Sequence, residues 1–297
     1  MQRQNRRRSL VLAIILFVLM ASLGTALGAT WGSWIVGLLG GLAFAGAQWG
    51  IARGMGTCLV MRSAGARELR PGEDTQLWNT VHEVSIAAAM PPPTIWLIDT
   101  ASPNAFATGF KPDDANVAIT TGLRQKLDRA ELQAVMAHEL GHIKNGDSGY
   151  MVLMAVLVGS IAMLADLGLR SLWYGRGMRH GGGSDKGKGG FQAIAMVIVL
   201  VLAIIAPIFS RILQAAVSRE REYLADATSI ELTREPQALV RALEKLSSDT
   251  EPMPGANRAT QHLWIVNPMR NAKKGGSMLA THPPMRKRIA RIQRSYM

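Results

Sequence analysis

Two histidines and a glutamate in the stretch "VMAHELGHIKNGD" (residues 135–147) have types and spacing suited to metal chemistry. His138 and His142 are four positions apart, and Glu139 lies between them. On a helix, this spacing directs two imidazoles at one zinc ion and holds the intervening carboxylate beside a water molecule on the metal. The pattern predicts a hydrolytic zinc site with Glu139 as general base. The alternative is a pair of histidines that only cap a helix near lipid headgroups.

A catalytic zinc ion needs a third protein ligand, and the best candidate lies in "SREREYLADAT" (residues 218–228). Glu222 and Asp226 are four positions apart and share a helical face. Asp226 is therefore able to accept the second N–H of a zinc-bound histidine while Glu222 binds the metal. Glu220 lies about 200° around the helix from Glu222, so both cannot point at one ion. The competing interpretation is a salt-bridged surface helix that uses the two arginines flanking Glu220.

The helix that carries the histidines has clear limits in the sequence. Asp128 with Glu131 three positions later forms a capping-box pattern, and Gly146 is typical of a helix end. Apolar residues at helical spacing define its core face, which differs from the face of the histidines. These residues are Leu132, Val135, Met136, Leu140 and Ile143.

Residues 53–148 are predicted to form an α+β unit. Helical spacing runs through "EDTQLWNTVHEVSIAAAM" (residues 73–90), and three prolines end it. Two short β-rich pieces follow at residues 94–99 and 116–122, with a polar loop between them. We expect them to pair in an antiparallel sheet of two or more strands.

The composition indicates a membrane protein. Of the 297 residues 48% are apolar, and the mean hydropathy is +0.12. No Asp, Glu, Lys or Arg occurs from Ser9 to Ala52, which is enough chain for two spanning helices of about 20 residues each. The turn between them is expected within Gly24–Ser33. A cleaved signal peptide is the alternative for the first apolar segment, but a second apolar block follows at once. Arginines before and after this hairpin place both of its ends in the cytoplasm.

Two further apolar runs extend over residues 149–165 and 191–210. They enclose a Gly-rich basic loop, which the positive-inside rule would not place outside the cell. Spanning, re-entrant and protein-packed arrangements stay open, and spanning is favoured because the last run is long and uncharged. A spanning hairpin would return Glu222 to the side of the histidines, near the cytoplasmic bilayer surface. The predicted parts are a transmembrane hairpin (1–52), the first catalytic part (53–148), a second apolar hairpin (149–210) and the second catalytic part (211–297).

The net charge of +12 raises the question of an anionic partner. Much of the basic charge lies beside apolar runs, so an anionic lipid bilayer is a simpler partner than nucleic acid, which we do not expect. Cys58 is the only cysteine, which excludes an intramolecular disulfide and a cysteine metal cluster. The sequence gives no indication of the oligomeric state.

The chain resembles the HtpX-type membrane zinc metalloproteases, a family related to the CAAX prenyl proteases. The matching pieces are "SPNAFATGF" (102–110), "VAITTGL" (117–123), "AHELGHIKNGD" (137–147), "SREREYLADA" (218–227) and "THPPMRKRI" (281–289). They occur in the family's order, with apolar segments in the family's places. The resemblance implies a mostly helical α+β integral membrane protein. Its catalytic domain would be zincin-like, of the gluzincin type, with up to four transmembrane helices.

The resemblance also assigns roles to individual residues. It implies one Zn²⁺ per chain bound by His138, His142 and Glu222, with Glu139 as general base. It also implies that Asp226 does not bind the metal itself but accepts a hydrogen bond from a zinc-bound histidine. It further assigns Asn104 and His282 to substrate or transition-state contacts, and makes Arg288 a structural partner of the site. From the residues alone, Asn104 is a loop residue, His282 belongs to a turn before proline, and Arg288 belongs to a basic C-terminal helix.

The implied function is cleavage of misfolded or damaged membrane proteins at cytoplasmic segments, in membrane quality control and the stress response. The protein would be multi-pass in the cytoplasmic (inner) membrane, with its N-terminus and active site facing the cytoplasm. One alternative enzyme is a CAAX-type prenyl protease. Another class of protein remains as well: a non-catalytic, zinc-stabilised membrane scaffold, or a binder of anionic lipid through the basic tail.

Overall fold

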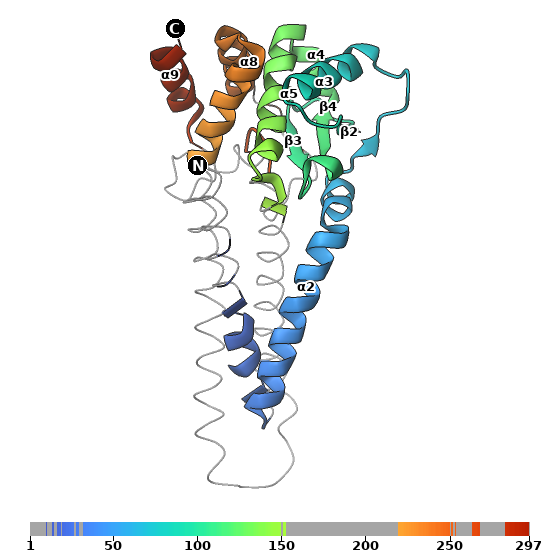
Figure 1. Cartoon of the computed structure of the whole chain (residues 1–297), viewed down its shortest axis with the longest axis vertical. Helices are drawn as coiled ribbons and strands as arrows, with labels where there is room; N and C mark the ends of the chain where they lie inside the picture. The colour runs from blue at the N-terminus through green and yellow to red at the C-terminus, as the bar shows by residue number, and fades with distance from the viewer. Residues whose placement is uncertain are drawn as a thin grey trace. The chain divides into compact units, whose positions relative to one another are not determined.

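The structure, a computed structural model, is shown in Figure 1. It describes residues 32–149, 151–152, 219–249, 251, 253, 263–267 and 283–296, and in the first apolar stretch residues 10, 14, 17, 18, 20–26, 28 and 29. The chain divides into two compact units. One consists chiefly of residues 3–52 and 154–213, and the other of residues 53–153 and 214–297.

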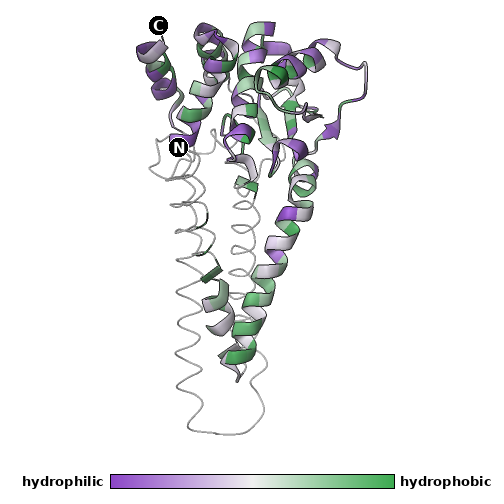
Figure 2. Cartoon of the chain, in the orientation of Figure 1, coloured by the Kyte–Doolittle hydropathy of each residue, from purple (hydrophilic) through white to green (hydrophobic). Residues whose placement is uncertain are grey.

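Helix α2 (Trp34–Ser63) is 30 residues long and continues past Ala52, where the apolar stretch ends. At 1.5 Å per residue it measures about 45 Å. Within the described part of the chain it is the one helix that is long and apolar enough to cross a membrane. Figure 2 shows it coloured mainly as apolar, with polar residues toward its C-terminal end. Most of the first apolar segment and almost all of the apolar runs at 149–165 and 191–210 lie outside the described residues, so a count of four spans stays a prediction.

Glycines join the first helical stretch to α2 by direct backbone contact. A Cβ added at Gly28 would lie 2.4 Å from the Cα of Gly37, and one added at Gly37 would lie 2.3 Å from the carbonyl oxygen of Gly24. Such small residues four positions apart let membrane helices approach closely. Gly24 and Gly28 therefore belong to the helix packing, and the turn itself comes at Gly32, whose φ of +99° favours glycine.

The second unit contains a four-stranded sheet of order β1-β2-β4-β3. Its strands are β1 (Arg67–Glu68), β2 (Thr94–Ile98), β3 (Ala105–Thr108) and β4 (Asn116–Thr120). The predicted antiparallel pairing of the two β-rich pieces is wrong, because β2 and β4 are parallel. The cause is β3, a short buried strand inside the predicted loop, which runs back beside β4. The chain thus reverses twice between the two predicted strands, which leaves them pointing the same way.

The helix predicted within residues 73–90 is confirmed as α3 (Thr75–Ala87), which lies between β1 and β2 in the chain. Asp74 caps its N-terminus, where the carboxylate accepts a hydrogen bond from the backbone N–H of Leu77. A short 3-10 turn, η1 (Pro112–Asp114), and helix α4 (Thr121–Lys126) flank β4.

Helix α5 (Arg129–Lys144) carries the histidines and begins with the predicted capping box of Asp128 and Glu131. It packs against α3, β3 and α8 (Pro236–Ser248), and α8 packs against α9 (Met285–Tyr296), as Figure 1 shows. The predicted core face of α5 is confirmed, since its five apolar residues are buried. The histidine face is buried as well, so polar groups on it must find partners inside the protein.

Candidate metal centre

Two helical segments meet closely beneath the site, α5 and the helical stretch over residues 219–233. A Cβ added at Gly141 of α5 would lie 3.2 Å from the Cβ of Thr228, so glycine permits the close approach. The Ser229 hydroxyl donates a hydrogen bond of 2.7 Å to the backbone oxygen of Ala134. These contacts hold one turn of the second helix opposite the histidines of α5.

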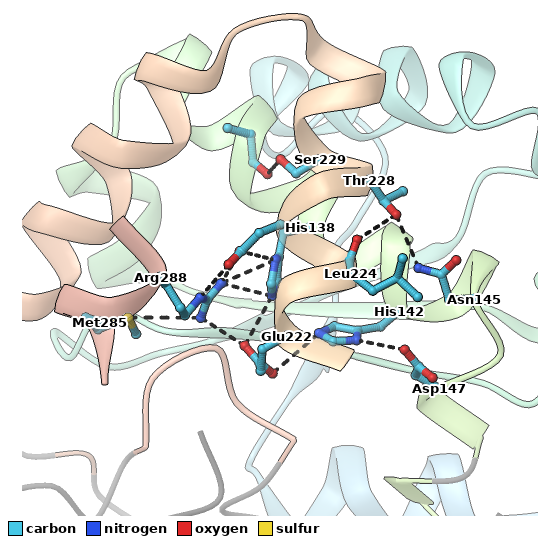
Figure 3. Close-up of polar contacts among 12 residues, drawn as sticks. His138, His142, Asn145, Asp147, Glu222, Leu224, Thr228, Ser229, Met285 and Arg288 are labelled. Atoms are coloured by element: carbon cyan, nitrogen blue, oxygen red, sulfur yellow. Dashed lines mark hydrogen bonds and ion pairs between the residues drawn. The ribbon is translucent and has the colours of Figure 1, made fainter. Parts of the chain in front are cut away.

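One ring nitrogen of each histidine, Nε2, faces the carboxylate of Glu222, as Figure 3 shows. Nε2 of His138 lies 3.7 Å from Oε2 of Glu222, and Nε2 of His142 lies 3.7 Å from Oε1. All three side chains are buried, and a ligand atom from each fits within 4.8 Å of the other two. Bonds of about 2.0–2.1 Å to a tetrahedral zinc ion separate its ligand atoms by about 3.3 Å. The donor set therefore fits one such ion after small movements.

The second ring nitrogen of His138 faces a carboxylate. Nδ1 donates to Oδ1 of Asp226 across 3.0 Å, which leaves Nε2 as the metal-facing atom. Burial raises the pKa of the Asp226 carboxyl, but the charge of Arg288 and the contact with His138 outweigh it and hold that pKa below its usual value. Burial and the nearby Arg288 lower the pKa of His138 to about 4, so its imidazole is neutral, as a metal ligand must be.

Arg288 of α9 connects two of the carboxylates and is fully buried. Its Nε and Nη2 donate to Asp226 across 2.9 and 2.5 Å, and Nη1 lies 2.9 Å from Oε2 of Glu222. Burial opposes the charge of Arg288, but Asp226 and Glu222 outweigh that effect and raise its pKa above the ordinary value. A single arginine therefore offsets the negative charge of two carboxylates. One is Glu222, a predicted metal ligand, and the other is Asp226, which contacts the predicted ligand His138.

Glu139 is 1% exposed and lies beside the donor set. A backbone hydrogen bond from Ala107 of β3 reaches its carboxylate, whereas Oε1 has no hydrogen-bond partner among the described residues. Burial, with a further contribution from the charge of Glu222, raises the pKa of Glu139 to about 7 despite the opposing effects of His142 and Arg288. A carboxyl group in this condition can take up and release a proton near neutral pH.

Asp147 and Arg221 also belong to the site, and sequence reasoning missed both. Nδ1 of His142 lies 3.6 Å from Oδ2 of Asp147, and Oδ1 of Asp147 lies 3.4 Å from Nε of Arg221. Burial lowers the pKa of His142, but Asp147, Glu222 and Glu139 outweigh it and raise that pKa to about 8. The sequence feature that could have pointed to Asp147 is its position directly after Gly146, the glycine that ends the helix. Arg221 gave no such signal, because an arginine beside glutamates suggests an exposed ion pair.

The other predicted residues have different surroundings. Glu220 is exposed, whereas Glu222, two positions later, is buried at the site. Asn104 is 2% exposed; its Nδ2 donates to the Val266 carbonyl across 2.8 Å, and its Oδ1 accepts from the Val266 N–H across 3.2 Å. These two hydrogen bonds of Asn104 hold the segment 263–267, and a contact with substrate stays a prediction. His282 lies outside the described residues.

Comparisons with known proteins place the chain in a family. The model of peptidase family M48 matches residues 71–295. A protease HtpX homolog of Thermoanaerobacter pseudethanolicus is 44% identical over 235 residues, covering 79% of this chain and 77% of the relative. Another, of Ligilactobacillus salivarius, is 38% identical over 295 residues and covers 98% of both chains. The crystal structure of Ste24p from S. mikatae aligns with a TM-score of 0.49 at 17% identity, covering 97% of this chain and 65% of that one, a likeness too weak to support an inference about function.

The fold and the site define a metalloprotease, a peptide hydrolase with a histidine–histidine–glutamate donor set. The chain belongs to peptidase family M48. Its relatives over nearly the whole length are named protease HtpX homologs, which confirms the resemblance to the HtpX type.

Proposed function

We propose that the protein is a zinc-dependent endopeptidase that cleaves membrane proteins. The observation that carries the proposal is the convergence of Nε2 of His138, Nε2 of His142 and the Glu222 carboxylate, with the buried carboxyl of Glu139 beside them. The donor set suits zinc, because imidazole nitrogens and a carboxylate oxygen are ordinary zinc ligands in hydrolytic sites. A zinc ion bound there supplies Lewis acidity, which polarises a peptide carbonyl and acidifies a water molecule.

Glu139 performs the proton transfers in this proposal. Its carboxylate takes a proton from water while the water oxygen bonds to the carbonyl carbon of the scissile peptide. As the C–N bond breaks, Glu139 returns that proton to the leaving nitrogen. In the metal-free site burial raises the pKa of Glu139 to about 7, and a bound zinc cation would lower it and favour the carboxylate form that acts as base. Burial excludes bulk water from the carboxylate and keeps the proton within the site.

Arg288, Asp226 and the two histidines prepare the site for this reaction. Asp226 accepts the Nδ1–H of His138 and so keeps Nε2 of that ring directed at the metal position. Arg288 holds Asp226 and the Oε2 side of Glu222 in place and offsets their charge. Asn104 and His282 remain candidates for contacts with substrate or with the developing oxyanion, as the family resemblance suggests.

The proposal extends to location and biological role. A multi-pass protein of the cytoplasmic membrane, with its N-terminus and site on the cytoplasmic side, would meet the cytoplasmic segments of other membrane proteins. The arginines that follow the first apolar hairpin favour that orientation. Cleavage of misfolded or damaged membrane proteins, in quality control and the stress response, is the role that the resemblance of the sequence to the HtpX-type metalloproteases implies.

The test uses the full-length protein purified in detergent, loaded with zinc and given an unprenylated membrane protein as substrate. Glu139→Gln should keep one zinc per chain and lose cleavage by a factor of at least about 10². Glu83→Gln, a change of a partly exposed glutamate on α3, is the control and should cleave like the wild type. Full activity of Glu139→Gln would contradict the mechanism. Cleavage restricted to prenylated C-terminal peptides would favour a CAAX-type protease, and zinc binding without any cleavage would favour a scaffold.

A further inference from the structure

The two histidines of the site have matching surroundings on their far sides. In each ring Nε2 faces Glu222, and Nδ1 faces an aspartate: Asp226 for His138, and Asp147 for His142. Each aspartate in turn faces a buried arginine. Arg288 forms an ion pair with Asp226, and Arg221, which is 4% exposed, forms one with Asp147. The site therefore contains two histidine–aspartate–arginine series, of which the family pattern suggests only the first.

A helix-ending turn places Asp147 beside His142. Gly146 has φ +73°, a left-handed conformation that glycine adopts without strain. The N–H of Asp147 donates to the carbonyl of His142 across 2.8 Å, and the N–H of Gly146 donates to the carbonyl of Ile143 across 2.9 Å. This pair of bonds is the Schellman motif, which folds the chain back along the end of the helix. Backbone geometry thus returns residue 147 to the side of residue 142, as Figure 3 shows.

The negative charge of Asp147 does not stabilise α5. The end of α5 carries partial negative charge on its last carbonyl groups, so an anion placed there is unfavourable. Asp147 is also 0% exposed, and a buried carboxylate is costly without partners. Both of its oxygens lack a hydrogen-bond donor among the residues that the structure describes, and so does Nδ1 of His142. Oδ2 of Asp147 and Nδ1 of His142 lie 3.6 Å apart, a few tenths of an ångström beyond hydrogen-bond range.

We propose that Asp147 is a positioning residue that accepts the Nδ1–H of His142 and thereby directs Nε2 of that ring at the metal position. A neutral imidazole that gives Nε2 to a metal carries its proton on Nδ1, so Nδ1 must then donate. Among the residues that the structure describes, Asp147 is the carboxylate that faces Nδ1 of His142, and Arg221 offsets its charge inside the protein. This inference rests on the proposed function, in which His142 is a zinc ligand.

The experiment measures zinc affinity, by competition with a chelator of known affinity, on full-length protein in detergent. Asp147→Ala should weaken zinc binding by about 10–100-fold, the usual effect of losing the group behind a ligand histidine. Asp147→Asn keeps an oxygen acceptor in the same place, so its dissociation constant should lie between those of the wild type and Asp147→Ala. Cobalt-substituted protein should report the same order through a changed visible absorption spectrum, which reflects ligand geometry.

Controls separate this inference from simpler explanations. Asp249→Asn, which disturbs the ion pair of a partly buried carboxylate with Lys126, should leave zinc affinity unchanged. Wild-type affinity in both Asp147→Ala and Asp147→Asn would overturn the inference, even if the zinc-free variants unfold at a lower temperature. If Asp147→Ala does not fold, wild-type affinity and cobalt spectrum in Asp147→Asn overturn it alone. His142→Ala tests the proposed function separately, because zinc affinity unchanged in that variant removes His142 as a ligand.

Discussion

Nη1 of Arg288 lies 2.9 Å from Oε2 of Glu222, although 66 residues separate the two in the chain. The same guanidinium makes two hydrogen bonds to Asp226, one helical turn beyond Glu222. The C-terminal helix α9 therefore contributes to the candidate metal centre. Its innermost arginine supplies the positive charge that two buried carboxylates need before a metal binds.

Removal of Arg288 should destabilise the zinc-free protein. In Arg288→Ala, two buried carboxylates lose their common partner, which should lower the free energy of unfolding by about 3–5 kcal/mol. Arg288→Lys keeps the charge without the planar donor geometry and should fall between that variant and the wild type. Arg294→Ala, an exposed arginine of the same helix, should change stability by less than about 0.5 kcal/mol. Denaturant unfolding in detergent measures all three. Equal stability of Arg288→Ala and Arg294→Ala would contradict this account.

Glu222 and Glu220 provide a direct comparison of a predicted ligand with its neighbour. Glu222→Ala should lose most of its bound zinc, because the buried site then keeps only two histidine ligands. Glu220→Ala should retain one zinc per chain, since Glu220 is exposed on another side of the same helix. Elemental analysis of the purified proteins gives the ratio. The opposite result would show that the third ligand has been misassigned.

Two glycines of α2 should respond in opposite ways to the same change. Gly37→Ala places a Cβ 2.3 Å from the carbonyl oxygen of Gly24, so the helical hairpin must open and should lose about 1–3 kcal/mol. At Gly46 the added Cβ meets no atom of the described chain within 4 Å. Gly46→Ala should therefore leave stability unchanged or raise it slightly, because alanine favours the helix. Thermal unfolding in detergent ranks the variants, and a lower midpoint for Gly46→Ala than for Gly37→Ala would count against the packing.

The ion pair between Asp74 and Arg124 should make the free energy of unfolding depend on pH in the acidic range. Burial raises the pKa of Asp74, but Arg124, 2.6 Å away, and the N–H of Leu77 outweigh it and hold that pKa below its usual value. Because the folded pKa is the lower one, the ionised pair stabilises the protein above the unfolded pKa of about 3.9, and this stabilisation is lost as pH falls through the folded pKa. Asp74→Asn keeps an N-cap side chain but not the charge. It should lose about 1 kcal/mol near neutral pH.

The measurement is the unfolding free energy of both proteins in detergent at several pH values. The difference between wild type and Asp74→Asn should be largest above about pH 5 and should shrink below about pH 4. A difference that is independent of pH would show that the charge of Asp74 contributes nothing. A difference that grows as the pH falls would reverse the sign of the argument.

Much of the arrangement of the candidate site was predictable because its residues lie at local helical spacing. The i, i+4 positions of His138 and His142 depend only on the period of α5, and so do the limits given by Asp128 and Gly146. The same period separates Glu222 from Glu220, and the structure has the first buried and the second exposed. Recognition of the family followed from these motifs and their order, and the matched family model confirms it.

Sequence alone determined the residue types of this site, its helical faces, the helix α3 and the presence of a long apolar helix. Only the tertiary structure decided that β2 and β4 run parallel, that Asp147 and Arg221 lie behind His142, and that the Asn104 amide holds Val266. The physical reason is the range of the interactions. Helical periodicity and capping act within a few residues, whereas strand direction and buried charge pairing depend on how distant segments pack, which no local pattern specifies.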